Sequence, residues 1–449
     1  MTRLFTLSRA RTLVAGAVLL ACSGGASALS FNEAYEAALR NDPAYRMSYY
    51  ENEAGKENRI IGRSYLLPNL SANASVYRNR LDQTIRLPNG KENFNQPKYT
   101  SHSSSVALRQ PLINMEGVAR YRQGAAQADL SAAIFDLRST EVALRVAGAY
   151  FDALLARDQL RLAKVQRDMY AEQSVVNRRM FELGQGTKTD TLETQARLDV
   201  AEAAVLEADD NVTVSRNTLE GVVGMEVTSL DELAGEFRFM PLTPSRFDEW
   251  KAIALANNPD VKAARLSVEV ARLEIDKAKA GHLPRLDFVA SYTKADSETI
   301  NTLNQDTVNR SVGLQLNVPL YAGGAVSAVS RQAVASHERA KAELEARTDR
   351  VLVELRKAHS QVVSSVARIE ALNKAVASGQ LLINATGQSI KGGERINLDL
   401  LTAQQQLTAS QRDLAQARYT YLMAALRMRM AAGTLGRGDI DQVAGFFRR

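Results

Sequence analysis

The sequence has almost no cysteine, since Cys22 is the single example in 449 residues. This scarcity excludes a disulfide framework, a cysteine-based metal centre and thiol catalysis. The chain also lacks a large excess of one charge, because 56 Lys and Arg residues face 50 Asp and Glu residues. From this near balance we expect no nucleic-acid partner.

Long apolar runs are missing as well, and no stretch reaches the roughly 20 residues that a transmembrane helix needs. One short run, residues 13–21, follows three arginines and precedes Ala26-Ser27-Ala28. This order is typical of a secretory signal peptide. We expect residues 1–28 to be removed by cleavage after Ala28. Residues 19–22 also fit a second interpretation, a lipoprotein signal in which Cys22 would be lipidated.

Proline is scarce and unevenly placed, because none of the ten lies between residues 112 and 240 or after residue 319. Since proline interrupts helices, these two stretches are free to form long ones. Apolar residues recur there every seven positions, which predicts coiled-coil packing between helices. The pattern predicts helices over residues 44–67, 116–182, 189–223, 325–390 and 397–432.

The chain contains two tandem copies of one unit. Residues 31–75 align without gaps to residues 247–291, and Asn41-Asp42-Pro43 falls on Asn257-Asn258-Pro259. The two copies are interrupted and followed by segments that lack the helical pattern. We expect repeat 1 over 29–223, an equatorial segment over 224–258, repeat 2 over 246–432 and an equatorial tail over 433–449.

Between its helices, each repeat switches to an alternation of apolar and polar residues. Examples of the apolar positions are Leu70, Ala72, Ala74 and Val76 in the first repeat, and Val312, Leu314, Leu316 and Val318 in the second. Such alternation over about ten residues predicts strands of a membrane barrel, although a hairpin on a soluble core has the same pattern. We expect hairpins over about 68–111 and 284–319, with loop tips at 77–100 and 294–308.

Four strands cannot close a barrel alone, because outer-membrane barrels have at least about eight. Three chains would supply about twelve strands. A helix over 116–182 would be about 100 Å long, and the helices over 44–67 and 189–223 nearly match it end to end. The predicted fold is an α+β membrane protein, a homotrimer whose 12-stranded β-barrel continues into a long α-helical barrel.

No group of residues points to catalysis or to a cofactor. The four histidines His102, His282, His337 and His359 are scattered without the spacing of metal ligands. No glycine-rich phosphate loop follows a predicted strand. We therefore expect neither enzyme activity nor a bound cofactor or metal.

Several motifs resemble the TolC family of outer-membrane export channels. They are Leu183-Gly184 with Thr189-Asp190, Gly393-x-Arg395-x-x-x-Asp399-x-Leu401, Ala417-Arg418-Tyr419-x-Tyr421-Leu422 and Gly433-Thr434-Leu435-x-x-x-Asp439. The resemblance covers nearly the whole chain after the signal peptide. It implies an outer-membrane trimer, surrounded by outer-membrane lipid, that extends into the periplasm and works with a periplasmic adaptor and an inner-membrane transporter. The chain is most similar to the branch that serves type I protein secretion, so the resemblance implies an ABC transporter and an exported protein substrate.

The resemblance also implies roles for residues at the two turns between long helices. Asp399 matches a position whose carboxylates ring the closed periplasmic entrance, and the second ring position is Thr402 here. Arg395 matches a residue that holds the entrance shut, with Thr189 and Asp190 as its partners. The residues alone support a second interpretation of Asp190 and Asp399, as first-turn acids stabilised by a helix N-terminus.

Two other functions remain open at this point. One is a duct for small molecules within the same architecture. The other is a periplasmic coiled-coil scaffold without a pore.

Overall fold

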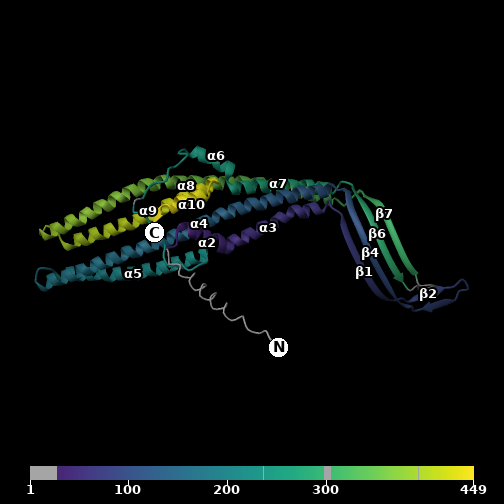
Figure 1. Cartoon of the computed structure of the whole chain (residues 1–449), viewed down its shortest axis with the longest axis horizontal. Helices are drawn as coiled ribbons and strands as arrows, with labels where there is room; N and C mark the ends of the chain where they lie inside the picture. Colours follow the sequence, from purple (N-terminus) through teal and green to yellow (C-terminus); the bar gives the residue numbers. More distant parts are fainter. Residues whose placement is uncertain (1–27, 236, 298–304, 393, 449) are drawn as a thin grey trace, which may run out of the picture. The chain divides into compact units, whose positions relative to one another are not determined.

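The computed structural model describes residues 28–235, 237–297, 305–392 and 394–448. Residues 1–27, which include Cys22 and most of the expected signal peptide, lie outside the described residues. The chain divides into two compact units. Figure 1 labels the helices and strands along the chain. Unit 1 contains the described residues up to Ser48, residues 136–258 and those from Asp349 onward, whereas unit 2 contains Tyr49–Phe135 and Pro259–Thr348.

Long helices dominate the chain. The helices are α2 (Phe31–Asn41), α3 (Pro43–Ser64), α4 (Met115–Glu182), α5 (Lys188–Val223), α6 (Phe247–Asn257), α7 (Pro259–Ala280), α8 (Ala325–Lys391), α9 (Asn397–Ala432) and α10 (Arg437–Ala444). All five predicted helices are confirmed, and the largest difference in a boundary is the end of α3, at residue 64 instead of 67. Among the described residues, no helix is long and apolar enough to cross a membrane.

Unit 2 contains a four-stranded antiparallel sheet in the order β1-β4-β6-β7. Its strands are β1 (Asn69–Arg80), β4 (Lys98–Ile113), β6 (Arg285–Ser297) and β7 (Gln305–Asn317). Leu70 stands opposite Leu108, which stands opposite Ala290, which stands opposite Val312, so one face of the sheet collects the apolar residues. This face is uncovered within the chain, with Leu70 70% exposed and Val312 74% exposed.

The prediction of a loop over 77–100 is wrong in part, because strands occupy much of this range. β1 extends to Arg80, and a second small hairpin forms from β2 (Gln83–Arg86) and β3 (Glu92–Asn95). Its turn is closed at Gly90, which has a φ of 75° and donates its N–H to the Leu87 carbonyl at 2.9 Å. Backbone ladders need no alternation of apolar side chains, so this hairpin has no periodic signal in the sequence. Likewise, the expected loop at 294–308 is shortened by β6 and β7.

The main core lies in unit 1, where the two equatorial segments meet α4. Phe31 of α2 stacks on Phe151 of α4, with ring centroids 5.6 Å apart. Phe447 lies in β8 (Phe447–Arg448) and stacks on Phe151 at 5.8 Å. β8 pairs with β5 (Glu232–Leu233), so the equatorial segments, expected to be irregular, contain a short sheet as well as α6 and α10.

The ends of α5 and α9 meet the junctions between α2 and α3 and between α6 and α7, respectively. Asn41 donates its side-chain amide to the Val223 carbonyl at 2.9 Å, and Asn258 does the same to the Ala431 carbonyl at 2.9 Å. Each of these helices is followed by a glycine in the left-handed backbone conformation, Gly224 after α5 and Gly433 after α9. These bonds give the two repeats the same end-to-end junction, as their lengths predict.

Candidate functional site at the helical turns

The turn between α4 and α5 ends in a capped helix. Gly184, with a φ of 71°, lets the chain reverse after α4. Thr187 then caps α5, because the Asp190 N–H donates to its side-chain oxygen at 3.1 Å. The Thr187 backbone N–H in turn donates to the Asp190 carboxylate at 3.3 Å, and the Thr187 hydroxyl also donates to it at 2.6 Å. Asp190 therefore completes a capping box, and its charge faces the positive end of the helix dipole.

The turn between α8 and α9 is followed by an acidic residue, Asp399, at the position equivalent to Asp190, but α9 has no such cap. Ile396 precedes α9 and provides no side-chain cap, and Asp399 is bonded through its N–H to the Ile396 carbonyl at 3.2 Å. Asp190 and Asp399 are both third residues of their helices, as the repeat predicts. The Asp399 carboxylate has no hydrogen bond or ion pair within the part of the chain that is described. It is therefore free for a ligand or a neighbouring chain.

The structure does not bring the predicted gate residues together within one chain. Arg395 is exposed, and among the described residues it forms no hydrogen bond or ion pair with Thr189 or Asp190. The Thr402 hydroxyl donates to the Leu398 carbonyl at 2.8 Å, inside its own helix. Gly393, part of the predicted turn, lies outside the described residues.

A small contact near the turns joins the two helical hairpins. Tyr170 of α4, Ala201 of α5 and Leu401 of α9 form a separate buried cluster, 3%, 5% and 1% exposed. Gln173 donates to the Asn397 side chain at 2.6 Å beside this cluster. We call Tyr170, Ala201 and Leu401 the hairpin clamp. The small Ala201 side chain allows the three helices to approach closely.

A second polar link between the hairpins lies next to the clamp. Arg197 of α5 donates to the Gln405 side chain of α9 at 3.0 Å and also pairs with Glu193 at 3.1 Å. The sequence analysis did not identify these residues. Tyr170 is one of several aromatic residues in α4, and nothing in the local sequence distinguishes it or indicates its partner.

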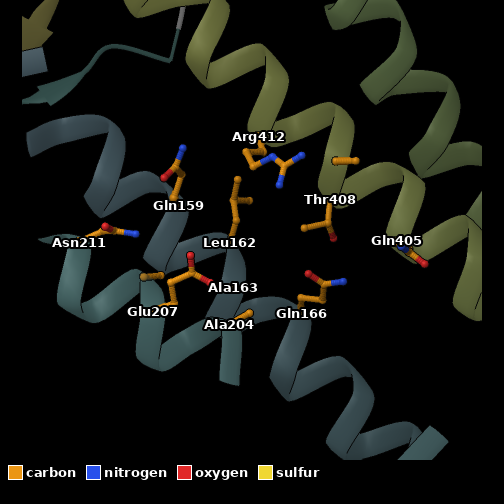
Figure 2. A pocket seen from close by; sticks show the side chains of 12 residues that line it. Gln159, Leu162, Ala163, Gln166, Ala204, Glu207, Asn211, Gln405, Thr408 and Arg412 are labelled. Atoms are coloured by element: carbon orange, nitrogen blue, oxygen red, sulfur yellow. The ribbon is translucent and has the colours of Figure 1, made fainter. Parts of the chain in front are cut away.

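A groove of about 500 Å³ separates the same hairpins on the equatorial side of the clamp. Figure 2 shows side chains of α4, α5 and α9 around it. The lining residues are Gln159, Leu162, Ala163, Gln166, Ala204, Glu207, Ala208, Asn211, Gln405, Thr408, Ala409 and Arg412. Glu207 and Arg412 are the only ionisable groups among them, so the lining contains no nucleophile with an adjacent base. The hairpins are thus tied near the turns and apart in the middle.

The equatorial core provides the fixed end from which both hairpins extend. Tyr419 of α9 donates its hydroxyl to the Asp158 carboxylate of α4 at 2.9 Å. Burial raises the pKa of Tyr419, and the Asp158 charge raises it further. Tyr150 of α4 donates to the Leu29 carbonyl at 2.9 Å, and burial raises its pKa as well. These neutral phenols hold α4 against α9 and against the N-terminal segment.

Comparisons with known proteins agree with this architecture. The outer membrane efflux protein family matches residues 34–225 and 250–434. The alkaline protease secretion protein AprF of Pseudomonas aeruginosa is 41% identical over 445 residues, covering 98% of this chain and 92% of AprF. The proteases secretion protein PrtF of Dickeya chrysanthemi is 38% identical, covering 96% of this chain and 94% of PrtF.

Solved structures share the fold. The outer membrane protein VceC of Vibrio cholerae superposes with a TM-score of 0.75 at 17% identity, covering 90% of this chain and 96% of VceC. The predicted combination of long helices and a four-stranded sheet is therefore confirmed as the fold of these channels. With both halves of the chain matched, the protein belongs to the outer membrane efflux protein family, the family of the TolC export channels, and it resides in the outer membrane and extends into the periplasm.

Proposed function

We propose that this chain forms the outer-membrane duct of a type I protein secretion system. The observation that carries the proposal is the end-to-end similarity to AprF and PrtF, two proteins named for protease secretion. Its cargo would be one or more exported proteins of the protease class. An inner-membrane ABC transporter would supply the energy, and a periplasmic adaptor would join it to the duct. The chain itself would be a passive conduit and not an enzyme.

The sheet supports a trimeric channel. β1 and β7 are its edges, so each leaves a row of backbone groups unpaired along 12 and 13 residues. Pairing β1 of one chain with β7 of the next would satisfy both rows. Three copies would then close a 12-stranded barrel with the apolar face toward outer-membrane lipid.

The opposite face suits a conduit for an unfolded polypeptide. It carries small neutral polar side chains, among them Ser71, Asn73, Ser103, Ser105 and Thr293. Ser291 and Ser311 bond to each other across β6 and β7 at 2.7 Å. The charged residues on this face are Arg109 and Arg285, both paired with Asp287 at the end of the strands near the helices. The rest of the face, among the described residues, is neutral and would not retain a particular passenger.

The helical turns would form the periplasmic entrance. Arg395, exposed and without a partner in its own described chain, would bond to Thr189 and Asp190 of a neighbouring chain and hold the entrance shut. Asp399 would form an acidic ring that is single instead of double, because Thr402 replaces the second acid. Arg395→Ser should raise single-channel conductance in planar bilayers, and unchanged conductance would remove this role. Asp399→Ala should weaken block by polyvalent cations, whereas an identical block would leave only the helix-cap role.

The N-terminal boundary is also a proposal. Leu29 is buried, and its N–H donates to the Ser229 carbonyl at 2.9 Å. Cleavage after Ala28 would leave a mature chain that begins at Leu29, which is held by this bond. Mass spectrometry of the purified protein distinguishes this end from one that starts at a lipidated Cys22.

One genetic experiment separates the possible functions. Deletion of the gene should remove one or a few proteins from the culture supernatant, and the intact gene should restore them. Drug hypersensitivity without any loss of secreted protein would instead indicate a small-molecule duct. A purified protein that forms no pores and no detergent-stable trimer would be a scaffold.

A further inference from the structure

Three basic residues stand together at one end of the sheet. Arg80 of β1 is directly opposite Lys98 of β4, and Arg78 lies two residues before Arg80 on the same face. We call these three residues the basic cluster. β1 follows α3 and β4 leads into α4, so the cluster occupies the end of the strands that is remote from the helices.

The cluster has no anionic partner in the described part of the chain. All three side chains are exposed, and among the described residues their one polar side-chain contact is a long hydrogen bond from Arg80 to the Gln96 side chain at 3.4 Å. Asp82 lies two residues beyond Arg80 without an ion pair, and Asp296 is placed opposite His102, further along the face. Like charges opposite each other on two strands destabilise the pair. An external anion would remove this repulsion.

The basic residues are confined to the apolar face. Val76, two residues before Arg78 on this face, is 66% exposed, and Leu70 further along is 70% exposed. The opposite face carries the neutral Tyr77, Asn79 and Tyr99 over the same stretch. One surface therefore places exposed apolar side chains next to exposed cations, which is the arrangement that a lipid with an anionic headgroup complements.

The second hairpin does not repeat this arrangement. At the corresponding end, the same face of β6 and β7 carries Lys294 and Arg310 together with Asp296 and Asp306. Two cations and two anions cancel there, so an excess of positive charge is specific to the first hairpin.

We propose that Arg78, Arg80 and Lys98 bind the phosphate groups of a phosphorylated glycolipid in the outer leaflet of the outer membrane. This rests on the proposed function, which places the apolar face in lipid and the strand ends outside the cell. Guanidinium groups match phosphate oxygens in a two-pronged geometry, and two of the three residues are arginines. Bound lipid would fix the depth of the first hairpin in the membrane.

The test uses the full-length trimer in nanodiscs. Phosphorylated glycolipid extracted from outer membranes is titrated in, and retained lipid is counted by native mass spectrometry. The same lipid after phosphatase treatment is the second probe. The variant Arg78→Gln, Arg80→Gln, Lys98→Gln should retain the phosphorylated lipid at least about tenfold less well, since each basic residue near an anionic lipid surface contributes severalfold to binding. The control Lys294→Gln, Asp296→Asn, which leaves the net charge of the second hairpin unchanged, should retain it like the wild type.

Two results would overturn the proposal: equal retention by the triple variant, or equal retention of the phosphatase-treated lipid by the wild type. Channel conductance of the same preparations separates this outcome from failure of the proposed function. A wild-type trimer that conducts but shows no phosphate-dependent retention refutes the lipid site alone. A wild type that neither assembles nor conducts refutes the channel on which the lipid site depends, and the lipid site with it.

Discussion

The hairpin clamp should hold the two helical hairpins of each chain together in the closed channel. Leu401 is 1% exposed between Tyr170 and Ala201, so replacing it with alanine removes buried contacts and leaves a cavity. A buried Leu→Ala change costs about 2–5 kcal/mol. The neighbouring Gln173–Asn397 bond contributes about 0.5–1.5 kcal/mol. The apolar contact is therefore the larger part of the link, and Leu401→Ala is the most informative change.

The expected result is a shift toward the open state. If the clamp is intact when closed and broken when open, the lower limit of about 2 kcal/mol for one clamp raises the ratio of open to closed states about 30-fold for each of the three chains, at 1.4 kcal/mol for each factor of ten. Single-channel recording in planar bilayers measures this ratio as the fraction of time spent at high conductance. Leu398→Ala is the matched control, because Leu398 lies in the same helix but is 37% exposed.

The reverse change should close the channel. A short, reducible thiol-reactive cross-linker would join the hairpins in the double variant Gln173→Cys, Asn397→Cys, because these two side chains are in contact at 2.6 Å. We expect lower conductance after cross-linking and recovery with a reducing agent. The reasoning is refuted if folded trimers of Leu401→Ala show wild-type open times, since the clamp would then be the same in both states.

Two further predictions concern unit 1. Burial and the Asp158 carboxylate raise the folded-state pKa of Tyr419; its neutral phenol therefore stabilises the fold fully below the unfolded pKa of roughly 10 and loses this effect as the pH rises. Thermal melting followed by circular dichroism should show a fall in Tm above about pH 10 that is smaller in Tyr419→Phe, and identical curves would contradict this origin. Gly433→Ala should lower stability by about 1–3 kcal/mol, because Gly433 has a φ of 72° and an added Cβ would lie 2.5 Å from the Asn257 backbone. Gly438→Ala, with nothing within 4 Å of the added Cβ, is the control, and an equal Tm for both variants would exclude the steric cause.

Local patterns in the sequence predict much of the fold. The absence of proline and the seven-residue apolar spacing predicted α4, α5, α8 and α9, since both depend only on neighbours within a few turns. The alignment of 31–75 with 247–291 predicted that α2 and α3 recur as α6 and α7, and they do so with the same lengths. The β2–β3 hairpin was not predicted, because its strands pair through backbone hydrogen bonds and carry no alternation of apolar and polar residues.

Part of the candidate site at the helical turns could also be predicted from the sequence, and part could not. The repeat placed Asp190 and Asp399 at equivalent turns, and both are third residues of their helices. That Asp190 is engaged in a capping box whereas Asp399 is not depends on the side chain three residues earlier, threonine in one case and isoleucine in the other. This difference was readable from the sequence once the helix boundaries were known.

The sequence by itself determined the helices, the alternating strands and the two-fold repeat, because each follows from periodicity along the chain. Only the tertiary structure decided which residues from distant segments meet. Tyr170 and Leu401 are 231 positions apart (401 minus 170), and no local spacing relates them. The same holds for Phe151 and Phe447, and for Arg80 facing Lys98 on one side of the sheet. Contacts of this kind arise from the packing of whole elements and from strand register, and that packing assembled the clamp, the core and the basic cluster.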